Sequence, residues 1–326
     1  MTRSATGSVV GSSPSVGRFA LTDLSAVFGG AVWLAVVVAG SLSAIERAVV
    51  LAPLVLVPLG LTMVGPLPVE GLPHWLYPAA VVLQPVGAVC VLASFLVSTP
   101  SVAAGAAVVW LLVTGLLGVV GLQRLVDRGG LAPISDTAID SGLVYSVVGA
   151  VALVLHHLGI SFWFEPVIIL LTAIHFHYAG FVLPVLAGLT GRAVGTPGRG
   201  FQLLTGVILL GPAIIAVGIS FSPLVEFVAV GLFTTTVAVF GGYVVVRVVP
   251  DRSRVQGLCL VGSALALPVS MLLALAYAVM VVSGIDPLGV SLSRMVRFHG
   301  SLNAFGFALL GLLGWRVDVP VRTGTT

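Results

Sequence analysis

The chain has 326 residues, of which 58% are apolar and only 8% charged, and its mean hydropathy is +1.20. A soluble domain carries about 25% charged residues, so this composition excludes a water-facing surface over most of the chain. The chain has 14 arginines, no lysine and 11 acidic residues, which gives a net charge of +3. In a soluble protein such a positive charge would suggest nucleic-acid binding. Here the arginines stand between apolar runs, which predicts an all-α polytopic transmembrane bundle whose partner is the lipid bilayer and not nucleic acid.

The chain begins with a polar segment, residues 1–18, that is rich in Ser and Gly and contains no acidic residue. Such a segment predicts a short flexible tail. The apolar run that follows, Leu24 to Leu42, is long enough to cross a bilayer, so we expect a retained first helix rather than a cleaved signal. The rest predicts one transmembrane domain over residues 19–318 and a second short tail over 319–326.

Ten apolar runs separated by Pro, Gly and charged residues follow one another along the chain, each close to the roughly 20 residues that span a membrane. The predicted spans are residues 24–43, 48–66, 75–97, 102–122, 142–163, 166–190, 201–221, 224–246, 256–283 and 297–315. The longest polar connection runs from Asp127 to Ser141. With these bounds, no pair of acidic residues lies inside the spans.

The distribution of arginines predicts the orientation of the spans. If the amino terminus is inside, eleven arginines fall in inner connections and three, Arg47, Arg294 and Arg297, fall in outer ones. Cytoplasmic loops carry the excess of Arg and Lys. Both termini are therefore predicted to be cytoplasmic in a multi-pass cell-membrane protein.

Five of the six histidines then lie in the outer half of the membrane. His156 and His157 stand near the outer end of the fifth span, and His299 stands at the outer edge of the tenth, one helical turn from Asn303. In the sixth span, His175 follows Pro166 by nine residues, which puts it about 14 Å deep at 1.5 Å per residue. Polar groups at such depths are costly in lipid and mark candidate functional sites.

Helix geometry limits which of these rings can meet. His175 and His177 point about 200° apart, since consecutive residues differ by 100°, so only one of them can face a shared site on a regular helix. We therefore predict a site with one histidine from each of three spans: His157, either His175 or His177, and His299. Asn303 and Arg297 would complete it, and the same histidines would be the ligands of any metal. The alternative to a functional site is a structural role for these residues. In that case the histidines form hydrogen bonds between helices, and Arg297 anchors the span at the membrane–water interface.

Two segments carry a family resemblance: HFHYAGFVLP, from His175 to Pro184, and RFHGSLNAFGF, from Arg297 to Phe307. They resemble the corresponding segments of the YndJ-like family, a group of multi-pass bacterial and archaeal membrane proteins. Some members are longer than this chain, and some are labelled transporters. The resemblance implies a membrane bundle and favours transport, and it assigns no catalytic residue.

Three functions remain open from the sequence. A transporter or permease for a small solute or ion is favoured by the ten spans and by the polar residues near mid-depth. A haem- or metal-binding protein, with an oxidoreductase activity, is the alternative that histidines on separate helices allow. The third is a non-catalytic membrane partner or assembly factor. No phosphate-binding loop, dinucleotide fingerprint or nucleophile elbow occurs, so an enzyme is not favoured and no cofactor is predicted.

Overall fold

The computed structural model describes residues 14–64, 75–286 and 288–320. Most of the predicted tails, residues 1–13 and 321–326, and the connection that contains His74 lie outside the described residues. Just before the first helix, β1 (Ser15–Val16) and β2 (Phe19–Ala20) pair as an antiparallel hairpin that turns at Gly17. The division into one transmembrane domain and two tails stays a prediction.

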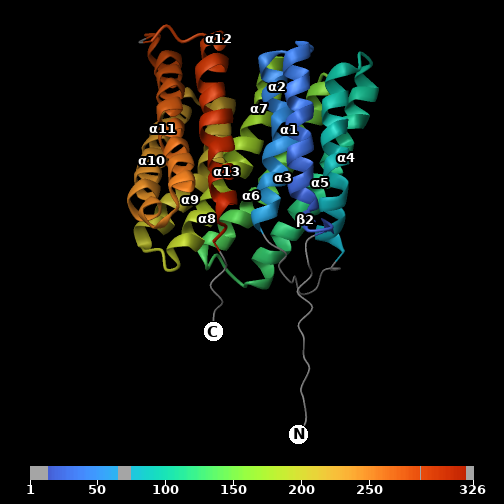
Figure 1. The fold of residues 1–326 in the computed structure, drawn as a ribbon. Helices are drawn as coiled ribbons and strands as arrows, with labels where there is room; N and C mark the ends of the chain where they lie inside the picture. The colour runs from blue at the N-terminus through green and yellow to red at the C-terminus, as the bar shows by residue number, and fades with distance from the viewer. Residues whose placement is uncertain (1–13, 65–74, 287, 321–326) are drawn as a thin grey trace.

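Ten helical spans are present in the described residues, which confirms the predicted number and the all-helical membrane fold (Figure 1). Several spans are built from consecutive segments, because π-helical turns (η1, η2, η4, η5) interrupt them. The segments are α1 (Leu21–Ala39), α2 (Ala44–Leu51), η1 (Ala52–Leu56), α3 (Val57–Val64), α4 (Leu76–Leu96), α5 (Pro100–Asp127), α6 (Ile134–His157), α7 (Pro166–His177), η2 (Tyr178–Val182), α8 (Leu183–Val194), α9 (Arg199–Phe221), α10 (Pro223–Arg247), η3 (Val249–Asp251), α11 (Arg254–Ser283), α12 (Leu292–Arg294), η4 (Met295–Gly300), η5 (Leu302–Leu309) and α13 (Leu310–Val317).

The fifth span differs most from its predicted range. It was predicted over residues 142–163, and the helix α6 instead runs from Ile134 to His157. The sequence between Asp127 and Ser141 was assigned to a polar loop because it contains several aspartates. In the structure Asp136 and Asp140 lie inside the first turns of α6 and are buried, so the prediction that no pair of acidic residues lies inside the spans was wrong.

The spans pack so that the middle of the chain lies in the middle of the bundle. α6 contacts α5 on one side and the sixth span (α7, η2 and α8) on the other, while α10 packs against both α9 and α11. In Figure 1 the first four spans and the last four stand on opposite sides of this centre. The first and last spans also meet, through the Asp23–Arg316 ion pair and through the edge-to-face contact of Trp33 with Phe305.

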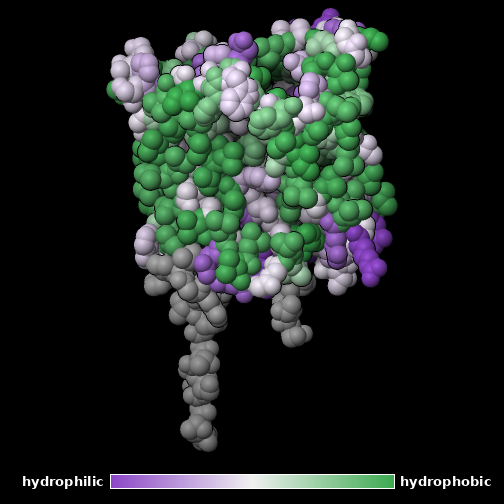
Figure 2. All heavy atoms as spheres, turned by 180° about the vertical axis from the view of Figure 1, so that it is seen from behind, coloured by the Kyte–Doolittle hydropathy of each residue, from purple (hydrophilic) through white to green (hydrophobic). Residues whose placement is uncertain are grey.

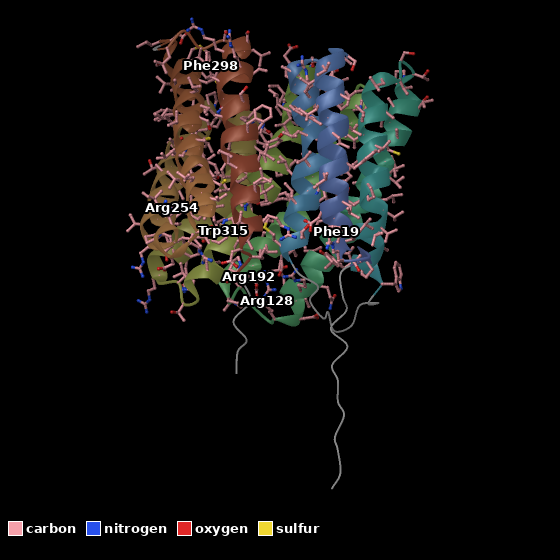
Figure 3. All side chains as sticks on the ribbon, viewed as in Figure 1. Phe19, Arg128, Arg192, Arg254, Phe298 and Trp315 are labelled. Atoms are coloured by element: carbon pink, nitrogen blue, oxygen red, sulfur yellow. The ribbon has the colours of Figure 1, made fainter. Side chains whose placement is uncertain are left out.

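The two ends of the bundle differ in composition. α1 begins and α13 ends at the same end, here called the inner end, and Arg128, Arg192 and Arg254 lie there as well (Figures 1 and 3). Phe298 lies at the opposite, outer end. Between the two ends the surface is a broad apolar band, as lipid contact requires (Figure 2).

The tryptophans near the ends of the spans divide into two groups. Trp75 and Trp163 are exposed, as an anchor at the membrane interface requires. Trp315 is only 1% exposed, and the guanidinium of Arg252 lies 5.5 Å from the centre of its ring. Trp315 is therefore a core residue and not an interface anchor.

Candidate functional site

The candidate site is a group of polar side chains in the outer half of the bundle, which we call the outer polar cluster: His175, His299, Asn303 and Ser270. The sixth span contributes His175, the ninth Ser270, and the tenth both His299 and Asn303. The rings of His175 and His299 have their centres 6.4 Å apart. The sixth, ninth and tenth spans thus supply the outer polar cluster together.

Hydrogen bonds fix the tenth-span side of this cluster. Nδ1 of His299 lies 3.0 Å from the carbonyl oxygen of Ser270, which identifies it as the donor nitrogen. Nε2 of His299 then accepts from the amide of Asn303 at 3.2 Å, and Oδ1 of Asn303 accepts from the Ser270 hydroxyl at 3.0 Å. Both ring nitrogens are used, so His299 is held in one orientation.

His175 is bound on one side only. Its Nδ1 donates to the carbonyl oxygen of Leu171 at 2.7 Å, within its own helix. No contact within the described residues occupies Nε2, and the side chain is exposed halfway along its span. The second, sixth and tenth spans contact one another around this level, and the Tyr178 hydroxyl of the sixth donates to the carbonyl oxygen of Ala48 in the second. His175 therefore presents a free imidazole nitrogen beside the fully bonded His299.

His177 points to a different neighbour, as the 200° separation requires. It is 2% exposed, its Nδ1 donates to the carbonyl oxygen of Ala173, and its Nε2 accepts from the indole of Trp110 at 2.9 Å. Gly149 packs against the same ring, because a Cβ there would lie 2.5 Å from Nδ1. His177 therefore links the sixth span to the fourth, through Trp110, and to the fifth, through Gly149.

The remaining candidates lie apart from the outer polar cluster. His157 packs edge-to-face against Phe95 of α4, at 5.0 Å between ring centres, and against His156. Arg297 is exposed, with its guanidinium 5.6 Å from the Phe298 ring at the outer end. Both residues are thus placed by contacts that do not involve His175.

The backbone around the cluster is irregular. The π-helical segment η2 begins directly after His177, η4 contains Arg297 and His299, and η5 contains Asn303. Single π-helical turns inside α-helices occur frequently at functional sites, because they redirect side chains that a regular helix would place elsewhere. η2 falls within the first motif that carries the family resemblance, and η4 and η5 overlap the second.

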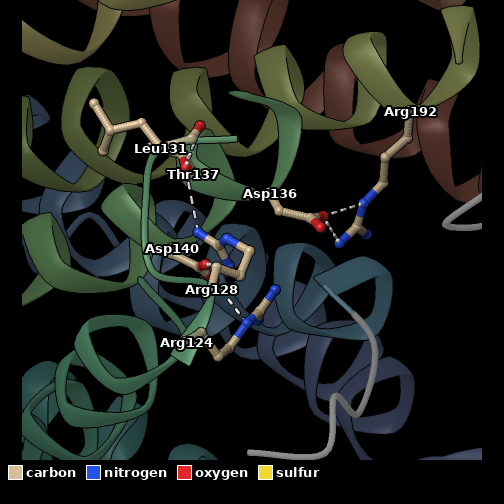
Figure 4. Close-up of polar contacts among 7 residues, drawn as sticks. All are labelled: Arg124, Arg128, Leu131, Asp136, Thr137, Asp140 and Arg192. Carbon is tan, nitrogen blue, oxygen red and sulfur yellow. Dashed lines mark hydrogen bonds and ion pairs between the residues drawn. The ribbon is translucent and has the colours of Figure 1, made fainter. Parts of the chain in front are cut away.

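Sequence reasoning missed a second buried cluster, at the inner end, which we call the inner ion-pair cluster (Figure 4). Arg192 donates from Nε and Nη2 to Oδ1 of Asp136, at 3.1 and 2.7 Å. Asp140 pairs with two arginines of the preceding helix, Arg124 at 2.8 Å and Arg128. The signal in the sequence was the spacing of the two aspartates, since residues four apart share one helix face.

Metal binding has limited support in the described part of the chain. No group of three or more His, Cys, Asp or Glu side chains gathers there in an arrangement suited to a metal ion. The His175–His299 pair offers two imidazoles, and one nitrogen of that pair is already bonded to Asn303.

Comparison with known sequences identifies the family. The profile of the YndJ-like protein family matches residues 47–307, which include the motifs that form the outer polar cluster and most of the helical bundle. The chain belongs to the YndJ-like family. A relative from Bacillus subtilis (strain 168), named "Uncharacterized membrane protein YndJ", is 30% identical over 216 residues, which are 66% of this chain and 38% of the relative. This YndJ-like chain thus matches less than half of that relative's length, and no solved structure matches it.

Proposed function

We propose that this YndJ-like protein is a transporter-type permease that binds a small polar solute or ion at the outer polar cluster. The observation that carries the proposal is the free Nε2 of His175, exposed halfway along a span where three spans meet. A polar group at that depth costs free energy unless it serves a site or a partner. Its neighbour His299 has a fixed hydrogen-bond pattern, as a binding site requires.

Polar side chains continue inward from the cluster, which a transport path also requires. Ser270 and Ser263 lie two turns apart on α11, and Ser263 donates to the carbonyl oxygen of Phe307 at 2.8 Å. Beneath them is a cavity of about 20 Å³, lined in part by Thr190, Ser263 and Trp315. A cavity of this size holds about one water molecule and is too small for a larger solute.

Solvent accessibility of position 175 tests the proposal. In a chain that carries Cys90→Ser and Cys259→Ser, we expect His175→Cys to react with a membrane-impermeant maleimide added from the predicted outer face. The matched control is Leu272→Cys, because Leu272 is 57% exposed and lies at a similar depth, about 16 Å from the outer end of α11. Equal lack of reaction at both positions would show that His175 faces lipid, and the proposal would fail.

Metal or haem binding is the second candidate, and the His175–His299 distance is what favours it. Histidine nitrogens bind first-row metals and haem iron. Binding at His299 would require Nε2 to release the amide of Asn303, so Asn303→Ala should increase metal content if this function is correct. Metal analysis and absorption spectra of the purified wild type and of Asn303→Ala test it, and two colourless, metal-free preparations would exclude it.

A further inference from the structure

The inner ion-pair cluster contains more positive than negative charge. Three guanidinium groups, on Arg124, Arg128 and Arg192, face two carboxylates, on Asp136 and Asp140, so the cluster has a formal charge of +3 − 2 = +1. All five side chains are at least 88% buried, and Asp140 is completely so. Buried charges are normally matched, since water cannot reach them.

Two arginines of this cluster are incompletely bonded within the described residues, Arg128 at Nε and Arg124. Its side chain is 4% exposed, and its Nε lies 2.8 Å from Oδ1 of Asp140, in an ion pair without hydrogen-bond alignment. Its Nη2 is buried and has no hydrogen-bond partner among the residues that the structure describes. A buried guanidinium nitrogen without an acceptor is rare, and an anion is one of the few groups that can satisfy it.

The direction of Arg124 indicates where such an anion would lie. In Figure 4 its guanidinium points away from Arg128, toward the side of the cluster that holds Asp136 and Arg192. The charges of Arg192 and Asp136 both act on Arg124, so the two guanidinium groups lie close enough to repel each other. An acceptor with several oxygens could bond to both groups and remove that repulsion.

We propose that the inner ion-pair cluster binds one phosphate group between Arg124 and Arg192. Planar guanidinium groups match phosphate oxygens two at a time, and a phosphate would reverse the excess positive charge. The cluster lies at the inner end, where a free phosphate or the phosphate of an anionic lipid headgroup could enter (Figure 3). This site is independent of the outer polar cluster and of transport.

Binding is measured on the full chain, purified in zwitterionic detergent without phosphate. One experiment titrates inorganic phosphate by calorimetry, and the other adds dioleoylphosphatidylglycerol to the micelles and detects bound lipid by native mass spectrometry. We expect saturable one-to-one binding in one of them. Saturation by phosphate identifies a free oxyanion as the ligand, and saturation by the lipid alone identifies a headgroup.

Two variants show whether the cluster is responsible. The double variant Arg124→Gln/Asp140→Asn removes the unsatisfied donor but keeps the formal charge of the cluster at +2 − 1 = +1. We expect it to bind the ligand about tenfold more weakly, and that loss would reflect the missing hydrogen bonds to the phosphate rather than a change in charge. Arg254→Gln removes an exposed arginine at the same end and should leave binding unchanged.

Several outcomes would overturn the proposal. One is that neither ligand binds the wild type saturably. This result does not depend on whether the variants fold. Another is that chloride at equal ionic strength displaces phosphate as well as sulfate does, which would indicate unspecific charge attraction. A third is that the double variant, eluting as a monodisperse protein, binds as tightly as the wild type.

Discussion

At the scale of single residues, the two neighbouring histidines of the sixth span have different roles. His177 has both ring nitrogens bonded and is 2% exposed, whereas His175 keeps one nitrogen free. The sequence could predict that the two rings point apart, because helix geometry alone decides that. It could not predict that Trp110 is the partner of His177, because 67 residues separate them along the chain.

The Trp110–His177 bond can be tested by Trp110→Phe, which removes the indole donor and leaves Nε2 of His177 buried without a partner. A buried acceptor that loses its donor costs about 1–3 kcal/mol, so the thermal unfolding temperature in detergent should fall measurably. Trp163→Phe is the control, since Trp163 is 68% exposed and its loss should have little effect. Equal shifts in the two variants would contradict a structural role for this bond.

At the scale of helices, the irregular turns decide how spans approach one another. Gly29 of α1 lies against the π-helical turn η1, so closely that a Cβ at position 29 would be 1.9 Å from the carbonyl oxygen of Leu54. A carbonyl in a helix cannot move aside as a flexible side chain can. The first span therefore reaches the second only because residue 29 has no side chain.

Gly29→Ala should separate the first two spans and destabilise the protein by about 1–3 kcal/mol, which is the usual cost of overpacking. Gly30→Ala is a matched control, because a Cβ at position 30 meets nothing within 4 Å. Alanine is the better helix former by about 1 kcal/mol, so Gly30→Ala should leave stability unchanged or raise it. Unfolding of both variants in the same detergent measures the difference.

The lengths of the apolar runs were sufficient to predict the ten spans. The start of the fifth span could not be predicted in this way, because it depends on ion pairs with arginines of the neighbouring spans. Asp136 and Asp140 look like loop residues in the sequence, and they enter the helix because Arg124, Arg128 and Arg192 surround them. Those arginines had been interpreted only as orientation signals in loops. The hydropathy pattern along the sequence does not show which residues that are far apart in the chain form ion pairs.

At the scale of the whole molecule, the arrangement of arginines still predicts an orientation. Arg128, Arg192 and Arg254 lie together at the inner end, where α1 begins and α13 ends (Figure 3). Arg124, Arg128 and Arg192 are also needed for buried ion pairs, so orientation and stability draw on the same residues. The placement of both termini in the cytoplasm remains a prediction from charge bias.

Reporter fusions test this orientation. A fluorescent protein fused after Thr326 should be bright in the bacterial cytoplasm, and alkaline phosphatase at the same position should be inactive. A fusion truncated after Ser283, where α11 ends at the outer end, should show the opposite behaviour. An active phosphatase at the full-length position would reverse the orientation and move the outer polar cluster to the cytoplasmic half.

The ion pairs of α6 also imply an order of assembly during synthesis. Asp140 finds Arg124 and Arg128 as soon as the fourth and fifth spans form a hairpin, because both arginines precede it in the chain. The ion pair of Asp136 with Arg192 forms later, because the ribosome adds Arg192 56 residues after Asp136. Translation of the sixth span, the one that carries His175, is thus the step that completes the ion pairs of the fifth span.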